Sequence, residues 1–425
     1  MTMLKQHYVR IIFLVLGVLL LLFESFVIHD KDLDIFVGAS RLVAEGKTCY
    51  EVWLESGTSG LKYFYSPLFA VLMIPFGYLP QWGYNLLWIS ASLLLMWRSF
   101  MLLQFYLPLD RLSQRQRNWF WVLVIISVAR MIADNLALGQ MTILLIWGTL
   151  ESMRLIFLKR YPAGCALLAL IINIKLIPLG LLAYLVYKRE LKAAGLIVFF
   201  LVLYLYLPAL VVGFDFNNQL LLDWKNSLSA TQEKSIYEDI GRSSLSALVP
   251  SLMLETPLQF SIRRNIIIAD EHTANLILNA TRLILLTVLA ILMRPPFKIR
   301  SSRRALLYDL SLVCLATPLI FPHQGKYALY YTLPAYSYCI FWLMDNKGLD
   351  VSKKQYRSVL AFTLLSFALI TLTTDGLIGR KASDLTEYLH LPVYGMIFLI
   401  VAVGWLKRDA AMQIAASTEL AGGYN

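Results

Sequence analysis

Charged residues are scarce in this sequence of 425 residues. Asp, Glu, Lys and Arg make up 15% of it, whereas hydrophobic residues make up 58%. A soluble domain carries about 25% charged residues, so the shortage excludes an ordinary soluble enzyme. Apolar runs recur along the whole chain, and their length of roughly 20 residues is the length that a membrane-spanning helix needs. The sequence predicts an all-α, polytopic membrane protein.

Cysteine is also scarce. Only four cysteines occur, Cys49, Cys165, Cys314 and Cys339, and three of them lie within apolar runs. No close pairing is visible, so the sequence indicates neither a disulfide framework nor a cysteine-based metal site. We expect no redox chemistry.

The net charge of +11 would suit a nucleic-acid binder, but the position of the basic residues favours another explanation. They lie in short loops between apolar runs, and basic short loops mark the cytoplasmic face of a membrane protein. The largest cluster is Arg294, Lys298, Arg300, Arg303 and Arg304, and smaller ones are Arg154, Lys159, Arg160 and Lys188, Arg189. We therefore predict membrane lipids, and no nucleic acid, as partners.

Charge also predicts the topology. The apolar run at 10–28 follows Lys5 and Arg10 and has no small-residue cleavage site, which favours an uncleaved first helix with a cytoplasmic N-terminus. Two polar segments, 29–64 and 213–272, contain more acids than bases. We predict that both are sizeable loops on the outer face.

The remaining apolar runs bring the predicted total to about 10–12 helices. They form a single domain over residues 1–409, which a polar tail follows at 410–425. Further spans are predicted at 84–105, 118–138, 139–157, 192–212, 273–294, 305–322, 328–344, 358–375 and 390–407.

Two other apolar segments do not have the pattern of plain spans. Residues 65–80 contain Pro67, Pro75 and Pro80, which favours a partial or broken helix. In residues 162–187, Lys175 and Pro178 divide two short halves between two basic loops. If this segment is a hairpin, Lys175 lies at its tip.

Three carboxylates, Asp30, Asp32 and Asp34, begin the first outer loop. Such a carboxylate can take a proton from a hydroxyl at the membrane surface. The acids can equally be a solvated cluster beside the membrane. As a D-x-D triplet, Asp32 and Asp34 can also bind a divalent cation.

Several short motifs follow one another over about 300 residues. They are Asp32-Leu33-Asp34-Ile35-Phe36 with Ala39, Gly46 and Tyr50, then Tyr63-Phe64-Tyr65-Ser66-Pro67-Leu68, Leu138-Gly139-Gln140, Ile174-Lys175-Leu176-Ile177-Pro178, and Thr317-Pro318 with Phe321, Pro322 and His323. In this order they resemble glycosyltransferase family 87, a family of GT-C membrane glycosyltransferases that includes polyprenol-phosphate-mannose-dependent alpha-mannosyltransferases. The sequence departs from the family at Thr142, Phe321 and Gln324, where Asn, Trp and a second His are usual, and Gly241–Leu245 is a poor match.

The resemblance implies a GT-C-like fold and the transfer of a mannose-like hexose. The donor would be a polyprenyl-phosphate sugar, and the acceptor a lipid-linked or cell-envelope glycan. The active site would face outward from a bacterial inner membrane. A donor with one phosphate has little need of a metal, so we expect no metal and no cofactor.

The resemblance also implies roles for particular residues. Asp32 looks like the catalytic base, with Asp34 and Asp30 as alternatives. The candidates for contact with the donor phosphate are Lys175, His323, Lys326 and Arg242. The candidates for other substrate contacts are Tyr65, Gln140 and Gln324, although tyrosines also anchor membrane proteins at the interface.

Some polar residues in apolar runs allow two interpretations. A lysine there costs about 2.5–3.5 kcal/mol on insertion scales and usually has a function, but Lys175 at a hairpin tip would only face water. His323 can likewise be a solvated loop residue. Arg130 and Asp134 lie one helical turn apart and can pair with each other. Arg282 can face a lipid-phosphate cavity or bridge polar groups inside the bundle.

Two other functions fit a polytopic chain with outer loops. A transporter or flippase of a lipid-linked sugar would show inverted repeats and acids at the bilayer midplane, whereas this sequence shows no repeat and its acids concentrate in the outer loops. An O-antigen polymerase or ligase would be expected to carry Arg and His in a large late outer loop, and residues 213–272 contain no His before His272. The glycosyltransferase is therefore the preferred interpretation, and these two functions remain its alternatives.

Overall fold

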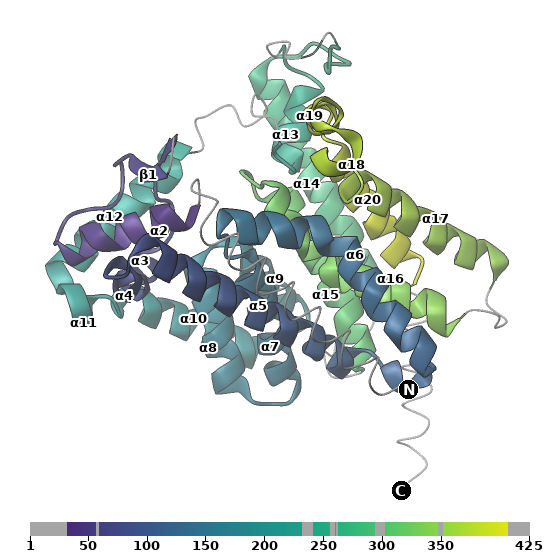
Figure 1. The fold of residues 1–425 in the computed structure, drawn as a ribbon, viewed down its shortest axis with the longest axis horizontal. Coiled ribbons are helices and arrows are strands. Elements are labelled where there is room, and N and C mark those ends of the chain that lie inside the picture. Colours follow the sequence, from purple (N-terminus) through teal and green to yellow (C-terminus); the bar gives the residue numbers. More distant parts are fainter. Residues whose placement is uncertain are drawn as a thin grey trace, which may run out of the picture.

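The computed structural model describes residues 32–56, 59–231, 241–255, 260, 262–293, 302–346 and 352–406. Helices make up most of this part of the chain (Figure 1). Its strands are β1 (Leu54–Ser56) and β2 (Ser59–Leu61), an antiparallel pair in which Leu54 lies opposite Leu61. The all-α class predicted from the sequence is confirmed. The predicted first helix at 10–28 and the tail at 410–425 lie outside the described residues.

Short helices form the region that follows the predicted first span. Helix α2 (Asp32–Ala44) precedes the strand pair, and α3 (Pro67–Leu72) and α4 (Ile74–Gly77) follow it. Helix α3 has six residues and α4 has four, so the broken helix predicted at 65–80 is confirmed. Ser66 caps α3 by accepting a hydrogen bond from the backbone N–H of Phe69, and Pro67 occupies the first turn, where its missing N–H costs nothing.

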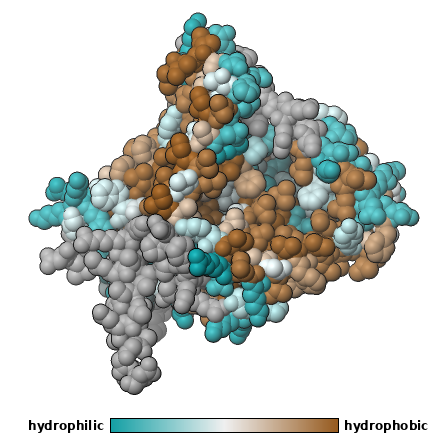
Figure 2. Space-filling model, turned by 180° about the vertical axis from the view of Figure 1, so that it is seen from behind, coloured by the Kyte–Doolittle hydropathy of each residue, from teal (hydrophilic) through white to brown (hydrophobic). Residues whose placement is uncertain are grey.

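Among the described residues, four helical segments are long and apolar enough to cross a membrane. They are α5 (Gln81–Tyr106), α6 (Gln114–Leu138), α14 (Glu271–Met293), and Leu191–Val212, which joins α10 (Leu191–Tyr206) to α11 (Ala209–Val212). A fifth span results if α19 (Arg380–Tyr388) and α20 (Leu391–Gly404), which meet at a bend of 65°, are one element. Large apolar areas cover the face shown in Figure 2. Apolar side chains remain exposed on these helices because lipid surrounds them.

The interior contains helices that touch little of the surface. In α15 (Arg303–Ile320), every residue from Arg304 to Leu319 is buried. Helix α16 (Leu333–Asp345) is buried from Leu333 to Trp342 and packs on α15. The predicted spans at 305–322 and 328–344 coincide with these helices. The total of 10–12 spans stays a prediction, because several of its members are short or enclosed by other helices.

Residues 162–187, which the sequence predicts as a possible hairpin, form a hairpin in the structure. Helix α8 (Tyr161–Ile174) ends just before Lys175, and the chain returns through η2 (Ile177–Leu179) and α9 (Gly180–Tyr187). The hydroxyl of Tyr161 donates to Glu190 Oε2 over 3.3 Å, which brings the two ends of the hairpin together. Lys175 therefore lies at the tip.

Part of the second predicted outer loop is helical. Residues 213–272 contain α12 (Phe214–Thr231) and α13 (Leu245–Ser251). The Trp224 Nε1–H donates to the carbonyl of Phe64 over 3.1 Å, and Thr48 donates to Asp223 Oδ2 over 2.7 Å, so α12 lies on the segment 29–64. The two predicted outer segments are in contact.

The other helices complete the bundle. They are η1 (Leu109–Arg111), α7 (Thr142–Phe157), η5 (Lys326–Thr332), α17 (Lys353–Ile370) and α18 (Asp375–Ile378).

Candidate active site

A cavity of about 1040 Å³ opens where the two predicted outer segments meet the hairpin tip. It lies between α2, the tip of the α8–α9 hairpin, α12, α13, α14 and the turn after α15. Seven of the nine site residues predicted from the sequence line it: Asp32, Tyr65, Gln140, Lys175, Arg242, His323 and Gln324. Asp34 and Lys326 do not. Residues separated by almost 300 positions in the sequence thus form one site.

Asp32, the first residue of α2, receives a hydrogen bond at Oδ2 from the side-chain amide of Gln140. Gln140 follows Gly139, which ends α6 in the left-handed conformation with φ +64°. A Cβ on Gly139 would lie 2.7 Å from Leu33 Cβ. Glycine is therefore needed twice, for its backbone conformation and for the close approach of α2. The Leu138-Gly139-Gln140 motif positions an amide against the carboxylate.

The surroundings of Asp32 suit a proton acceptor. Burial raises the pKa of its carboxyl above the usual range, and the hydrogen bond from Gln140 and the charges of Lys175 and Arg242 lower it again only in part. A carboxylate with a raised pKa is a stronger base while it remains ionised at neutral pH.

Asp34 points elsewhere. Its Oδ1 accepts a hydrogen bond of 2.6 Å from the hydroxyl of Tyr84 on α5. Residues two apart on a helix lie on different sides of it, so Asp32 and Asp34 do not form a pair. The described residues contain no group of three or more His, Cys, Asp and Glu side chains placed to hold a metal ion. The structure thus assigns Asp32, and not Asp34, to the cavity.

Lys175 lies between two aromatic rings. Its Nζ is 5.5 Å from the ring centre of Tyr65 and 5.1 Å from that of Tyr327, within the range of cation–π contacts. Tyr65 is itself held by Tyr50, whose hydroxyl donates to the Tyr65 carbonyl over 2.7 Å. The Lys175 side chain is partly exposed to the cavity. The hairpin tip thus presents a cation to the cavity rather than to bulk water.

Burial also alters the charge state of Lys175. Desolvation lowers the pKa of its ammonium group to about 8, although the nearby Asp32 carboxylate favours the charged form. The cation is therefore present at neutral pH and is lost in moderately alkaline solution.

Arg242 and His323 come from two turns that are joined by their backbones. The N–H of Ser243 donates to the carbonyl of Gln324 over 2.7 Å, and the Arg242 carbonyl lies 3.0 Å from His390 Nδ1. His323 has a φ of +56°, a conformation that few residues other than glycine adopt. These contacts fix the two turns beside each other at the cavity wall.

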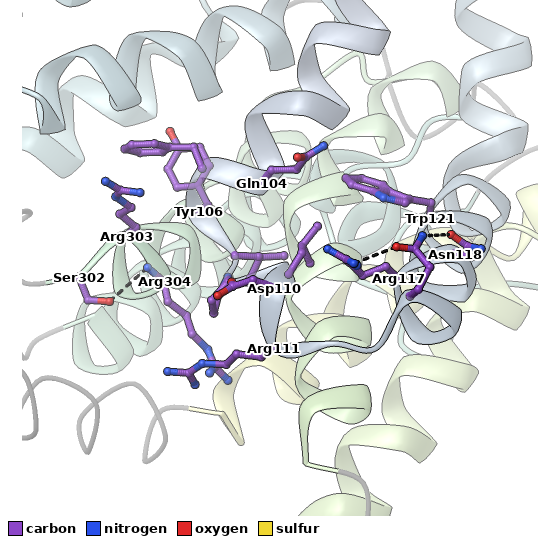
Figure 3. Close-up of a pocket in the computed structure, with 15 residues that line it drawn as sticks. Gln104, Tyr106, Asp110, Arg111, Arg117, Asn118, Trp121, Ser302, Arg303 and Arg304 are labelled. Carbon is purple, nitrogen blue, oxygen red and sulfur yellow. Dashed lines mark hydrogen bonds between the residues drawn. The ribbon is translucent and has the colours of Figure 1, made fainter.

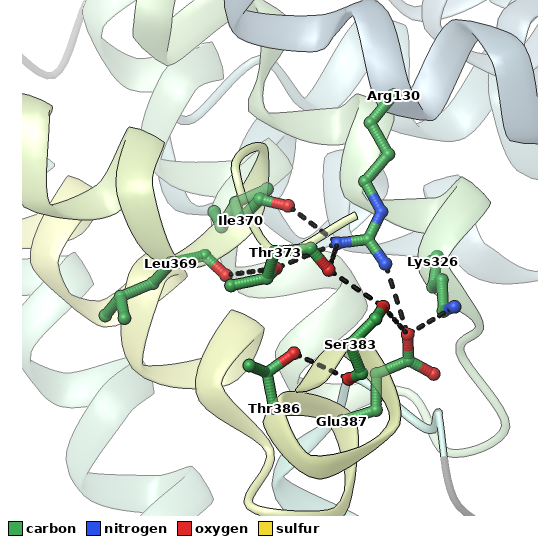
Figure 4. A network of polar contacts seen from close by, with 8 residues as sticks. All are labelled: Arg130, Lys326, Leu369, Ile370, Thr373, Ser383, Thr386 and Glu387. Carbon is green, nitrogen blue, oxygen red and sulfur yellow. Dashed lines mark hydrogen bonds and ion pairs between the residues drawn. The ribbon is translucent and has the colours of Figure 1, made fainter. Parts of the chain in front are cut away.

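Lys326 belongs to a different network (Figure 4). Its ammonium group forms an ion pair with Glu387, which also contacts Arg130 Nη2 at 3.1 Å. Arg130 donates further to the carbonyl and hydroxyl of Thr373, over 2.9 and 2.8 Å. The expected pairing of Arg130 with Asp134 is thus replaced by a pairing with Glu387, which joins α6 to α19.

The structure adds residues that the sequence did not single out. Glu271, Asn275 and Asn279 on α14 line the cavity together with Arg282, at the spacing of one helix face, and Tyr327 lines it beside Lys175. Arg282 donates to Ser246 Oγ over 2.7 Å and to Asn279 Oδ1 over 3.2 Å. Polar residues at intervals of three and four in an otherwise apolar helix are a signal that could have identified this face.

The fold and the cavity first define the class of protein: a helical membrane protein with a charged cavity between the segments 29–64 and 213–272. The sequence model of glycosyltransferase family 87 matches residues 63–322, which is more than half of the chain. The chain belongs to this family and is a glycosyltransferase. The crystal structure of ArnT from Cupriavidus metallidurans bound to undecaprenyl phosphate is similar at a TM-score of 0.41 and 16% sequence identity, over 97% of this chain and 79% of the ArnT chain. Comparison with curated protein sequences gives no significant match.

Proposed function

We propose that the protein transfers a mannose-like hexose from a polyprenyl-phosphate donor to a lipid-linked or cell-envelope glycan. The reaction takes place on the outer face of a bacterial inner membrane. One observation carries the proposal: Asp32, Lys175 and Arg242 line the same cavity, so that a base and two cations surround one space. A sugar phosphate requires this combination of charges.

The proposed reaction is a direct displacement. The acceptor hydroxyl oxygen forms a bond to the anomeric carbon while the bond from that carbon to the phosphate oxygen breaks. The hydroxyl proton passes to the carboxylate of Asp32. Polyprenyl phosphate leaves with the bonding electrons, and Lys175 and Arg242 stabilise the negative charge that it gains.

Helix α14 provides a path for the lipid part of the donor. Its polar face lines the cavity, whereas Leu276, Leu283 and Ile284 are 64–67% exposed on the same helix. A polyprenyl chain in the bilayer can contact the apolar surface while its phosphate reaches the cavity. Arg282, at the boundary between these surfaces, supplies a third cation for the phosphate.

Two buried amides suit a polyhydroxylated ligand. Gln140 Oε1 and Gln324 Oε1 are buried at the cavity and have no hydrogen-bond partner among the described residues. A buried acceptor without a partner costs about 1–3 kcal/mol. Sugar hydroxyl groups would supply the missing donors, so we assign the two glutamines to the hexose.

The test is an assay of hexose transfer from a short-chain polyprenyl-phosphate mannose to endogenous acceptors in membranes. Asp32→Asn is expected to lower turnover about a hundredfold or more, because the amide keeps the shape of the carboxylate but cannot take the proton. Asp34→Asn is the matched control, since Asp34 contacts Tyr84 outside the cavity. An Asp34→Asn variant that loses transfer beside an active Asp32→Asn variant would contradict the assignment of the base.

A further inference from the structure

Figure 3 shows a second cavity, whose volume is about 720 Å³. It lies at the opposite end of α15 from the candidate active site. Ser302, Arg303 and Arg304 line it where α15 begins, whereas Ile320 to Gln324 line the first cavity where α15 ends. The rest of its wall comes from the end of α5, from η1 and from the first turns of α6. The proposed transfer reaction uses none of these residues.

Positive charge dominates this cavity. Four arginines line it, Arg111, Arg117, Arg303 and Arg304, together with a single carboxylate, Asp110. Asp345 lies 3.9 Å from Arg111 and 3.6 Å from Arg304. Even with Asp345 included, the arginines exceed the carboxylates by two. The cavity therefore attracts an anion.

Aromatic rings accompany the arginines. The guanidinium of Arg303 lies 4.5 Å from the ring centre of Phe105, and Trp121 forms part of the wall. Trp119, on the same helix as Trp121, is 54% exposed. Tryptophan residues gather at the depth of the lipid headgroups, which indicates that the cavity lies at a membrane interface.

The length of α15 indicates which interface this is. Its 18 residues extend over about 27 Å, close to the thickness of the hydrocarbon core. The two cavities thus lie near opposite surfaces of the bilayer. The arginines at this end, Arg111, Arg117, Arg303 and Arg304, favour the inner surface.

We propose that the second cavity binds the phosphate of an anionic phospholipid from the inner leaflet. Arginine forks hold phosphate oxygens through paired hydrogen bonds, and basic pockets between membrane helices bind anionic headgroups. The rings of Phe105 and Trp121 provide an apolar surface for the glycerol and the first methylene groups. The lipid stabilises the junction of α5, α6 and α15.

Lipid binding to the purified full-length protein tests the proposal. Native mass spectrometry in detergent would measure binding of phosphatidylglycerol, of zwitterionic phosphatidylcholine, and of inorganic phosphate. The double variant Arg117→Gln, Arg303→Gln is expected to bind phosphatidylglycerol about tenfold or more weakly. Arg115→Gln is the matched control, because Arg115 is exposed on the same turn of α6 but does not line the cavity, and its binding should equal that of the unaltered protein.

Three results would overturn the proposal. They are equal phosphatidylglycerol binding by the double variant, equal binding of phosphatidylcholine, and competition by millimolar inorganic phosphate, which would make the cavity a site for a soluble anion. A second measurement does not depend on the folding of a variant. In the unaltered protein, a photoreactive phosphatidylglycerol should label peptides from residues 104–121 or 302–304, and labelling confined to other segments would contradict the site.

Discussion

At the scale of single residues, Lys175 connects the electrostatics of the cavity to the pH dependence of the reaction. The group is charged below its pKa of about 8 and neutral above it. The rate constant kcat/KM should therefore fall as the pH rises through about 8, because the leaving phosphate loses a cation. On the acid side, kcat/KM should rise as Asp32 loses its proton.

The matched variant for this pH profile is Lys175→Arg. A guanidinium stays protonated in proteins, so the alkaline fall should move to higher pH even if the rate at neutral pH decreases. An alkaline fall that is unchanged in Lys175→Arg would assign the titration to another group.

Lys175 and His323 are further predicted to act on the same phosphate. Each of Lys175→Ala and His323→Ala should lower turnover about a hundredfold or more, and the double variant should lose less than the product of the two effects. The measurement is turnover at saturating donor. Single variants with turnover close to that of the unaltered protein would leave Lys175 as an ordinary lysine at a hairpin tip and His323 as a solvated histidine.

Residue types and the order of the motifs predict most of the residues that line the cavity. They do not predict contacts between residues that lie far apart in the sequence. Lys326 follows the His323 turn closely, so its position suggested a phosphate contact. Its actual partner, Glu387, lies 61 residues further along, and sequence spacing gives no indication of such a contact. The sequence likewise leaves Asp34 open as an alternative to Asp32, because only the packing of the folded chain shows that the Asp34 carboxylate accepts a hydrogen bond from Tyr84.

At the scale of elements, the end of α6 determines the position of Gln140. Gly139→Ala introduces a Cβ 2.7 Å from Leu33 Cβ at a position with φ +64°, and alanine is disfavoured there by about 1 kcal/mol or more. We expect a lower melting temperature and a lower turnover, because α2 and Asp32 must shift away from Gln140. Thermal unfolding and the transfer assay would measure the two effects.

Gly195→Ala is the control for this substitution. Gly195 lies inside α10, and nothing lies within 4 Å of an added Cβ. Alanine has a higher helix propensity than glycine, so the melting temperature should stay unchanged or rise. If Gly195→Ala loses as much stability as Gly139→Ala, the result would contradict the argument that the end of α6 requires glycine at position 139.

Proline and charge signals predicted two elements that a hydropathy profile alone would treat as spans. Pro67, Pro75 and Lys175 mark the breaks in the 65–80 and 162–187 segments, and the structure has short helices in both. Helix α12 was predicted as part of a loop, because its polar composition resembles solvated chain. Its helical structure is supported by contacts with the first outer segment, such as that of Trp224 with Phe64, and these depend on tertiary packing.

At the scale of the whole molecule, the charge asymmetry predicts which ends face outward. The acid-rich segment 29–64 places Glu55 outside, and the basic short segment 345–357, which the positive-inside rule assigns to the cytoplasmic face, places Lys354 inside. Both side chains are exposed. Because the four natural cysteines are buried, Glu55→Cys and Lys354→Cys can be labelled selectively. An impermeant thiol reagent added to intact cells should label Glu55→Cys alone, and labelling of both to the same extent would refute the orientation.

The number of membrane spans does not follow from hydropathy alone. A hydropathy profile measures apolar length, but it does not show whether lipid or protein surrounds a helix. Helix α15 is buried on all sides and contains Arg304 and Asp309, whereas the buried residues of α10 are only Ala193, Ala194 and Ile197. Both are apolar in sequence, and only their neighbours distinguish a core helix from a lipid-facing one.

The buried helix α15 also sets a fixed distance between the two cavities. A rigid helix cannot shorten when the surrounding bilayer becomes thinner or lengthen when it becomes thicker. In a bilayer of unsuitable thickness, both cavities stay at headgroup depth only if the protein tilts or the bilayer deforms locally, at a cost of fractions of a kcal/mol per Å. The proposed placement of the two cavities therefore predicts that lipid binding and sugar transfer are strongest together in bilayers whose hydrocarbon thickness is close to the length of α15.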